Sequence, residues 1–240
     1  MSQAKSRRVG HSVTIGLALA ALAAAGGAMD ARQANMLTAD EKAAGWRLLF
    51  DGTTLNGWRG FKAPAPAGWA AADGALVRTG PGGDLMTADQ FGDFELQLEW
   101  KVGPAGNSGI MFRVTADTKF PYETGPEVQV LDNSRHQDGA VPATSAGSNY
   151  ALHAPVRDVT RPVGEWNAVR LIVRGAHVEH WLNGVKLLEY EVGSADWEAR
   201  VKASKFGKIP PYGRTKRGHI ALQDHGNVVG YRNLKIRELK

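Results

Sequence analysis

From residue 46 onward, apolar and polar residues alternate in short segments, and this period of two is typical of β-strands. The clearest segment is DFELQLEWKV, Asp93–Val102, in which every second residue from Phe94 is apolar. Such alternation places one face of a strand in a core and the other toward water. Seven further segments have a similar pattern: Gly109–Val114, Glu127–Asp132, Trp166–Gly175, His177–Leu182, Val185–Val192, His219–His225 and Tyr231–Leu239.

Turn-forming residues separate these segments. Asn183–Gly184 predicts a two-residue hairpin turn, and Asp73–Gly74 predicts a second one. Two short helices are expected, one over Thr38–Ala44, where a threonine and Glu41 are spaced as a capping box, and one over Ala195–Phe206. We find no internal repeat and no second domain. About ten to twelve strands around one core predict an all-β sandwich of two antiparallel sheets with one or two short helices.

The N-terminus has the pattern of an export signal. Lys5, Arg7 and Arg8 precede an apolar run over residues 13–28 that ends in small residues. A transmembrane anchor is disfavoured because these sixteen residues are rich in alanine and glycine, whereas a spanning helix needs about 20 apolar residues. The two arginines fit a twin-arginine signal or an ordinary basic region, so the route stays open.

We therefore expect a signal peptide over residues 1–28, a linker with a short helix over residues 29–45, and a single domain over residues 46–240. The mature protein is expected to be periplasmic or secreted, without stable membrane insertion once the signal is removed.

The amino-acid composition excludes several kinds of site and partner. The chain has 240 residues and no cysteine, which excludes disulfides, cysteine-ligated zinc and a thiol nucleophile. Its Lys+Arg count of 29 against an Asp+Glu count of 24 gives a formal charge of +5. Removing the signal takes three basic residues and no acidic one, so the mature charge is 26 minus 24, or +2. A nearly neutral domain has no basic stripe to follow phosphates, so we expect no nucleic-acid partner.

Strand parity indicates which polar side chains can converge, because residues two apart share a face. The core-facing residues would be Ile110, Phe112, Val114, Val128, Val130, Ile220 and Leu222. The outward polar residues would be Arg113, Glu127, Gln129, Gln223 and His225. If these strands are neighbours, a carboxylate, a guanidinium and an imidazole share one surface, which is competent for proton transfer and oxyanion stabilisation.

For each of these residues taken alone, an ordinary solvated side chain is the favoured explanation. What favours a site is their position at strand ends beside two long loops, Thr115–Pro126 and Asn133–Ser148. A glycosidase with two opposed carboxylates is weakly supported, because Glu127 and Asp132 are five positions apart and fall on opposite faces of a strand.

A divalent metal is a further expectation left open, with Glu127 and His225 as candidate ligands, although no close ligand spacing indicates a site. His177 and His180 are three apart on one strand and therefore face opposite ways. We interpret both as structural.

Seven motifs in order along the chain resemble the 3-keto-disaccharide hydrolase family. They are LLFDGTTLNGW (48–58), DFELQLEW (93–100), NSGIMFR (107–113), TGPEVQVLD (124–132), GEWNAVRL (164–171), LNG (182–184) and GHIALQDHGNVVGYRNLKI (218–236). The resemblance spans nearly all of the chain after the signal. It implies a concanavalin A-like jelly-roll sandwich, export, and cleavage of glycosides already oxidised at C3 of the sugar.

The implied reaction needs one base and one acid. A ketone at C3 acidifies the hydrogen at C2, so that a base removes it, the glycosidic oxygen leaves C1, and water adds afterwards. Glu127 and His225 would be base and acid in an unassigned order, and Arg113 or a metal would bind the oxyanion. The residues expected to bind the sugar are Asn107, Gln129, Asp132 and Gln223.

Two alternatives remain open at this point: a noncatalytic, lectin-like carbohydrate-binding module of the same fold, and a conventional glycosidase acting on the unoxidised sugar. In each case the partner is a small carbohydrate. The sequence specifies neither the sugar and its linkage nor the oligomeric state.

Overall fold

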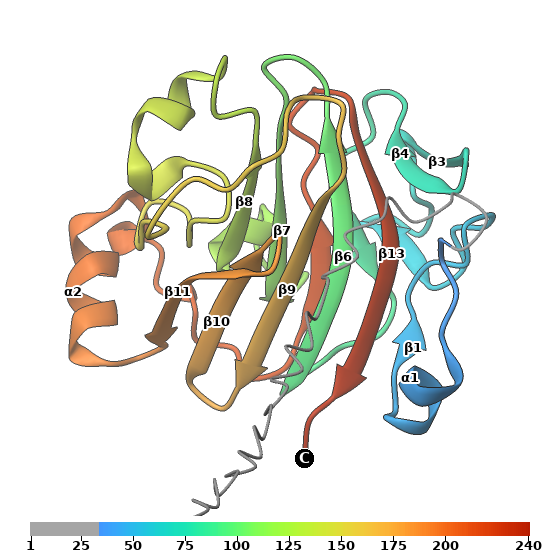
Figure 1. The fold of residues 1–240 in the computed structure, drawn as a ribbon. Helices are drawn as coiled ribbons and strands as arrows, with labels where there is room; N and C mark the ends of the chain where they lie inside the picture. The colour runs from blue at the N-terminus through green and yellow to red at the C-terminus, as the bar shows by residue number, and fades with distance from the viewer. Residues whose placement is uncertain (1–33) are drawn as a thin grey trace, which may run out of the picture.

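The computed structural model describes residues 34–240, so the expected signal peptide lies outside the described residues. Two antiparallel sheets pack face to face, which confirms the predicted sandwich (Figure 1). The larger sheet has the strand order β11-β10-β9-β6-β13-β4-β3, with β1 paired to β13. Its strands are β1 (Arg47–Leu48), β3 (Trp69–Ala72), β4 (Ala75–Arg78), β6 (Phe94–Val102), β9 (Asn167–Arg174), β10 (His177–Leu182), β11 (Val185–Glu191) and β13 (Val229–Glu238).

The smaller sheet has the order β2-β5-β12-β7-β8. Its strands are β2 (Trp58–Gly60), β5 (Leu85–Thr87), β7 (Asn107–Val114), β8 (Glu127–Leu131) and β12 (His219–Leu222). Both expected hairpin turns form: Asn183 and Gly184, with φ of 49° and 81°, connect β10 to β11, and Asp73 and Gly74 connect β3 to β4.

Two short helices accompany the sheets, as the sequence indicates. Helix α1 (Ala39–Ala43) begins after Thr38, whose side chain accepts a hydrogen bond in the expected capping box. Helix α2 (Ala195–Ala203) is shorter than expected, because Ser204 is extended and its hydroxyl caps a separate 3-10 turn, η5 (Lys205–Lys208). None of the helices in residues 34–240 has the length and apolarity needed to cross a membrane.

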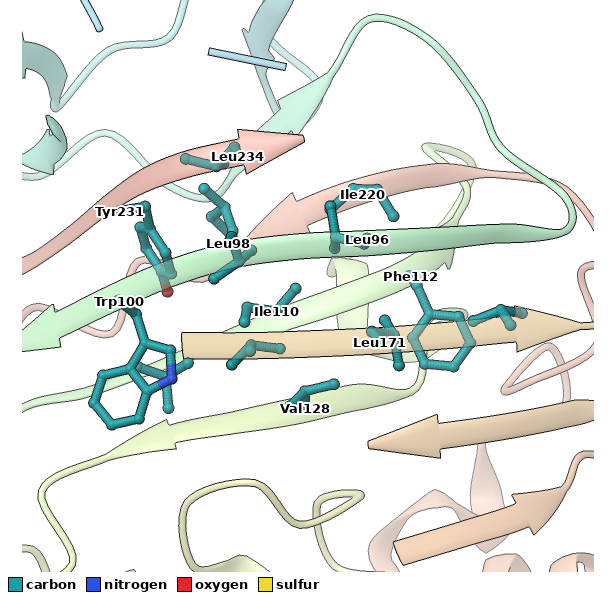
Figure 2. Packing of buried hydrophobic residues seen from close by; sticks show 14 of the residues in the cluster. Leu96, Leu98, Trp100, Ile110, Phe112, Val128, Leu171, Ile220, Tyr231 and Leu234 are labelled. Atoms are coloured by element: carbon teal, nitrogen blue, oxygen red, sulfur yellow. The ribbon is translucent and has the colours of Figure 1, made fainter. Parts of the chain in front are cut away.

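The core lies between the sheets and is built from the apolar faces that strand alternation indicates. Figure 2 shows side chains of both sheets meeting in this layer, and all of them are buried. Those labelled are Leu96, Leu98, Trp100, Ile110, Phe112, Val128, Leu171, Ile220, Tyr231 and Leu234.

A bulge in β7 breaks the expected alternation. The register pairs His219 with Val114 and Ala221 with Met111, so β7 contains one residue more than β12 over this span. Arg113 lies at the bulge with a φ of 54°. The parity of the strand is therefore reversed beyond it, and Val114 does not face the core between the sheets as expected. It packs with Met111 in a separate cluster on the outer face of the smaller sheet.

The bulge also redirects Arg113. Its guanidinium donates hydrogen bonds to the carbonyl of Gly92 at 3.3 and 3.2 Å and to that of Gly175 at 2.9 Å, and it pairs with Asp93 at 3.2 Å. The residue is 5% exposed. Arg113 therefore ties the loop before β6 to the turn after β9 and does not share a surface with Glu127, which corrects the expectation from parity.

Replacing Arg113 with methionine would remove a buried guanidinium and its part-buried hydrogen bonds to the carbonyl groups of Gly92 and Gly175. We expect Arg113→Met to lower the free energy of unfolding by about 2 kcal/mol, measured as a lower urea midpoint with an unchanged slope. Arg174→Met is the control, because Arg174 is exposed at the end of β9 and its replacement should change stability by less than about 0.5 kcal/mol. Equal midpoints for Arg113→Met and the unmodified protein would contradict this role.

Candidate active site

A pocket with a volume of about 190 Å³ opens on the outer face of the smaller sheet. It is lined by Asn107, Tyr122, Glu127, Gln129, Tyr150, Lys205, Gln223 and His225. Five of the seven residues that the sequence assigns to catalysis or sugar binding are among them. A larger hollow of about 490 Å³ lies beside α1 against the other sheet, but its Glu41 and Lys235 pair with each other and its lining is mainly apolar. The pocket of about 190 Å³ is therefore the candidate site, because the expected acid, imidazole and amide side chains converge there.

The pairing of β7 with β8 positions the floor of the pocket. Gly109 lies opposite Gln129, and Met111 lies opposite Glu127. The Glu127 side chain crosses over Gly109 so closely that a Cβ atom there would lie 1.8 Å from Glu127 Oε1. Only glycine leaves this space, so the Glu127 carboxylate can occupy its position only if residue 109 is glycine.

Glu127 is 4% exposed, and within residues 34–240 no group donates a hydrogen bond to its carboxylate. Burial raises the pKa of Glu127 to about 8, because the ionised form loses hydration there. The positive charge of Lys205 acts in the opposite direction, and the negative charges of Asp84 and Asp138 act in the same direction as burial. A carboxyl group in this setting exchanges a proton near neutral pH.

Two amide side chains beside Glu127 have unpaired oxygens. Gln129 Oε1 and Asn107 Oδ1 are buried, and neither has a hydrogen-bond partner in the described part of the chain. The Asn107 Nδ2 atom lies 3.3 Å from His136 Nε2. Because buried polar groups are normally paired, these two acceptors indicate a ligand that offers donors, such as the hydroxyl groups of a sugar.

His225 lies at the exposed rim. Strand β12 ends at Leu222, so His225 belongs to the following loop and not to the strand that the sequence indicates. The loop is held by Asp224, whose carboxylate pairs with Arg78 and accepts a hydrogen bond from Gly226 N at 3.0 Å. Gln223 N donates to the carbonyl of Gly109 at 2.9 Å, which keeps the start of this loop beside β7.

The opposite wall was not identified from the sequence. Tyr122 belongs to the first long loop, Tyr150 follows the second, and Lys205 is in η5. Tyr150 Oη donates a hydrogen bond to Asp138 Oδ2 at 3.1 Å. The sequence does place a tyrosine in the first long polar loop and another just after the second. These tyrosines could have indicated the wall, because an aromatic ring beside a polar site offers a sugar a flat apolar surface.

Asp132 does not line the pocket, which corrects its assignment to sugar binding. Its carboxylate accepts hydrogen bonds from Ala105 N at 2.8 Å, Ser134 N at 3.0 Å and Ser134 Oγ at 2.6 Å. It therefore caps the loops at the end of β8. Arg113 is also absent from the lining, so the pocket has the expected acid and imidazole without the expected guanidinium.

Metal-ligand atoms gather elsewhere in the described residues. His177, Glu179 and Glu189 on β10 and β11 have ligand atoms within 4.8 Å of one another. These groups already pair, since His177 Nδ1 lies 2.6 Å from Glu191 and Trp181 Nε1 donates to Glu179.

The neighbouring His180 is buried against the Gly147 carbonyl and Tyr190 Oη, so the two histidines do face opposite ways. At the pocket, the Glu127 carboxylate, the His225 imidazole and the two unpaired amide oxygens have the ligand types that a divalent cation accepts.

Comparison with known proteins gives a consistent picture. The model of the 3-keto-alpha-glucoside-1,2-lyase-like domain family matches residues 45–237. A 3-keto-disaccharide hydrolase from Bacteroides thetaiotaomicron is 35% identical over 82% of this chain and 79% of its own length. A crystal structure of a candidate glycosyl hydrolase from Parabacteroides distasonis superposes with a TM-score of 0.82 at 36% identity, covering 86% of this chain and all of the other.

A second candidate glycosyl hydrolase from Parabacteroides distasonis superposes with a TM-score of 0.65 at 27% identity, over 81% of this chain and 99% of its own. The family model alone spans most of the chain, from the residue before Trp46 to the last strand. The chain therefore belongs to the 3-keto-alpha-glucoside-1,2-lyase-like domain family and is an enzyme of the glycoside-cleaving hydrolase class.

Proposed function

We propose that this enzyme cleaves the glycosidic bond of 3-keto-glycosides, including 3-keto-disaccharides, by proton abstraction at C2, elimination and hydration. The observation that carries the proposal is the Glu127 carboxyl group, which is buried at the pocket floor, receives no hydrogen bond from the described residues and has a raised pKa. A base with a pKa near the working pH is suited to removing a weakly acidic proton from carbon.

The reaction uses the groups at the two ends of the pocket. The Glu127 carboxylate takes the C2 proton, and the electron pair moves onto the C3 oxygen to form an enolate. When the enolate collapses, the C1–oxygen bond breaks, and His225 at the rim gives a proton to the departing oxygen. Water then adds to C1 of the unsaturated ketone and a proton returns to C2, so that the products are a 3-keto sugar and an alcohol.

The amide groups are suited to holding the sugar during these steps. Asn107 and Gln129 have unpaired oxygens that accept from sugar hydroxyl groups, and Gln223 extends the polar wall toward the rim. A two-carboxylate glycosidase mechanism fits less well, because Glu127 is the one carboxylate among the residues that line the pocket.

Glu127→Gln tests the base directly. The amide keeps the size of the side chain but accepts no proton, so we expect kcat on a 3-keto-glucoside to fall about 1000-fold, measured as release of the alcohol. Glu165→Gln is the matched control, because Glu165 is exposed and outside this pocket, and it should keep full turnover. Turnover of the unoxidised glucoside alone, or full turnover by Glu127→Gln, would contradict the proposal.

The same assay with a chelator tests the open metal question. Release that stops with the chelator and returns with a divalent cation would assign a metal to the oxygen ligands beside Glu127. Release that is unchanged would leave proton transfer to the side chains alone.

The pH dependence follows from the state of Glu127. The base must be ionised, and burial raises its pKa to about 8. We therefore expect kcat/KM to rise with pH along a limb whose midpoint lies at about 8, whereas an exposed glutamate would place that midpoint at about 4.3. A pH profile of initial rates over this range measures the midpoint. A profile already level at pH 5 would show that another group is the base.

We also propose that the protein is exported, on the basic and apolar pattern of residues 1–28. Expression in a bacterial host should give a mature protein that begins near residue 29, as measured by intact mass. Replacing Leu17 and Leu19 with lysine should leave the full-length precursor inside the cell, because the apolar run is broken. Full-length protein retained in the membrane fraction would indicate the anchor instead.

A further inference from the structure

Removal of the C2 proton places negative charge on the C3 oxygen, and enzymes stabilise such charge with a donor or cation placed in advance. Arg113, the residue expected for this task, lies at the β7 bulge, donates to the backbone carbonyls of Gly92 and Gly175 and does not line the pocket. The proposed reaction therefore requires another group in the pocket. Among the described residues that line the pocket, Lys205 is the one lysine or arginine.

The Lys205 ammonium is held over three aromatic rings. Nζ lies 4.2 Å from the ring centre of Tyr150, 5.1 Å from that of Phe206 and 5.5 Å from that of Tyr122. Each distance is within the range of a cation–π interaction, and Tyr122 and Tyr150 themselves line the pocket. The rings fix the cation at the wall without using its hydrogen-bond donors.

Those donors have no partner in the described part of the chain. Among residues 34–240, Lys205 forms no salt bridge within 4.0 Å, although Glu127 and Asp138 are near enough to act on its charge. Loss of hydration lowers the pKa of Lys205, and the two carboxylates act against that change. An ammonium group with three free donors in a pocket is available to a ligand oxygen.

A stack of rings keeps η5, which contains Lys205, in place. Phe206 is 1% exposed and its ring lies 4.0 Å from that of Tyr212 with an interplanar angle of 8°. Tyr212 stacks on Trp197 of α2 at 5.8 Å, and Trp197 stacks on Tyr190 of β11 at 5.3 Å. Figure 1 shows α2 beside β11 at the edge of the sandwich. This stack joins the segment to the rigid sheet and so gives Lys205 a defined position.

We propose that the Lys205 ammonium binds the C3 oxygen of the 3-keto sugar and stabilises the negative charge that develops there when Glu127 removes the C2 proton. This inference rests on the proposed function. No bond to the lysine forms: the proton passes from C2 to the carboxylate, and the electron pair moves to the oxygen beside the ammonium.

Lys205→Met tests the inference with two matched variants. We expect it to lower kcat about 100-fold, with a smaller change in KM, and to slow exchange of the C2 hydrogen for deuterium by the same factor. Lys205→Arg keeps the charge and should retain more turnover than Lys205→Met. Lys208→Met is the control, because Lys208 is exposed in the same 3-10 turn and outside the pocket lining, and it should behave as the unmodified enzyme.

The pH profile separates this role from a structural one. The positive charge of Lys205 lowers the pKa of Glu127, so its removal should shift the rising limb of kcat/KM to higher pH in Lys205→Met but not in Lys208→Met. An unchanged limb together with kcat within threefold of the unmodified enzyme would overturn the inference while leaving the proposed function intact.

Borohydride trapping distinguishes the remaining alternative. A covalent adduct of the unmodified enzyme with the 3-keto sugar, absent in Lys205→Arg, would show that the lysine forms an imine with the C3 carbonyl and would overturn the electrostatic role. Absence of any cleavage or C2 exchange by the unmodified enzyme would overturn the proposed function itself, and this inference with it.

Discussion

The site depends on a carboxyl group that is kept out of water and receives no hydrogen bond from the described residues. Such a group is unstable in its ionised form, and its proton affinity therefore rises. Three neighbouring charges also change the pKa of Glu127: Lys205 favours the ionised carboxylate, whereas Asp84 and Asp138 disfavour it. The unpaired oxygens of the two amide groups add no stabilising donor. A ligand that brings hydrogen-bond donors would therefore pair with groups that the described residues leave unpaired.

The two sheets provide the core and position the pocket floor, whereas the loops provide the pocket walls. The two sheets bury a continuous apolar layer, and the register between β7 and β8 aligns Glu127 and Gln129 on one outer face. That face is not open to solvent as in a simple two-layer protein, because Tyr122 from the first long loop packs against the cluster of Met111 and Val114. The loops therefore convert a flat sheet surface into a pocket, and the stacked rings of α2 and η5 complete its cationic wall.

Alternation along the strands was sufficient to predict the sandwich, the two hairpin turns and the shared face of Glu127 and Gln129, because these depend on local chemistry and on a period of two. Arg113 could not be placed in this way, since one extra residue in β7 reverses parity and only the pairing with β12 shows it. Lys205 was missed for another reason: its place in the pocket comes from stacking among rings distant in the sequence, and Ser204 ends the helix just before it.

Gly109 has a wider consequence for reading relatives of this chain. A methyl group at position 109 would collide with the side chain of Glu127 on β8, the neighbouring strand. A homologue can therefore retain the glutamate and still lack the space that its side chain occupies here. Surveys that score only ionisable groups would count such a protein as active. Inspection of this family for the proposed base should therefore include the residue at the position of Gly109, because any larger side chain there would displace the glutamate.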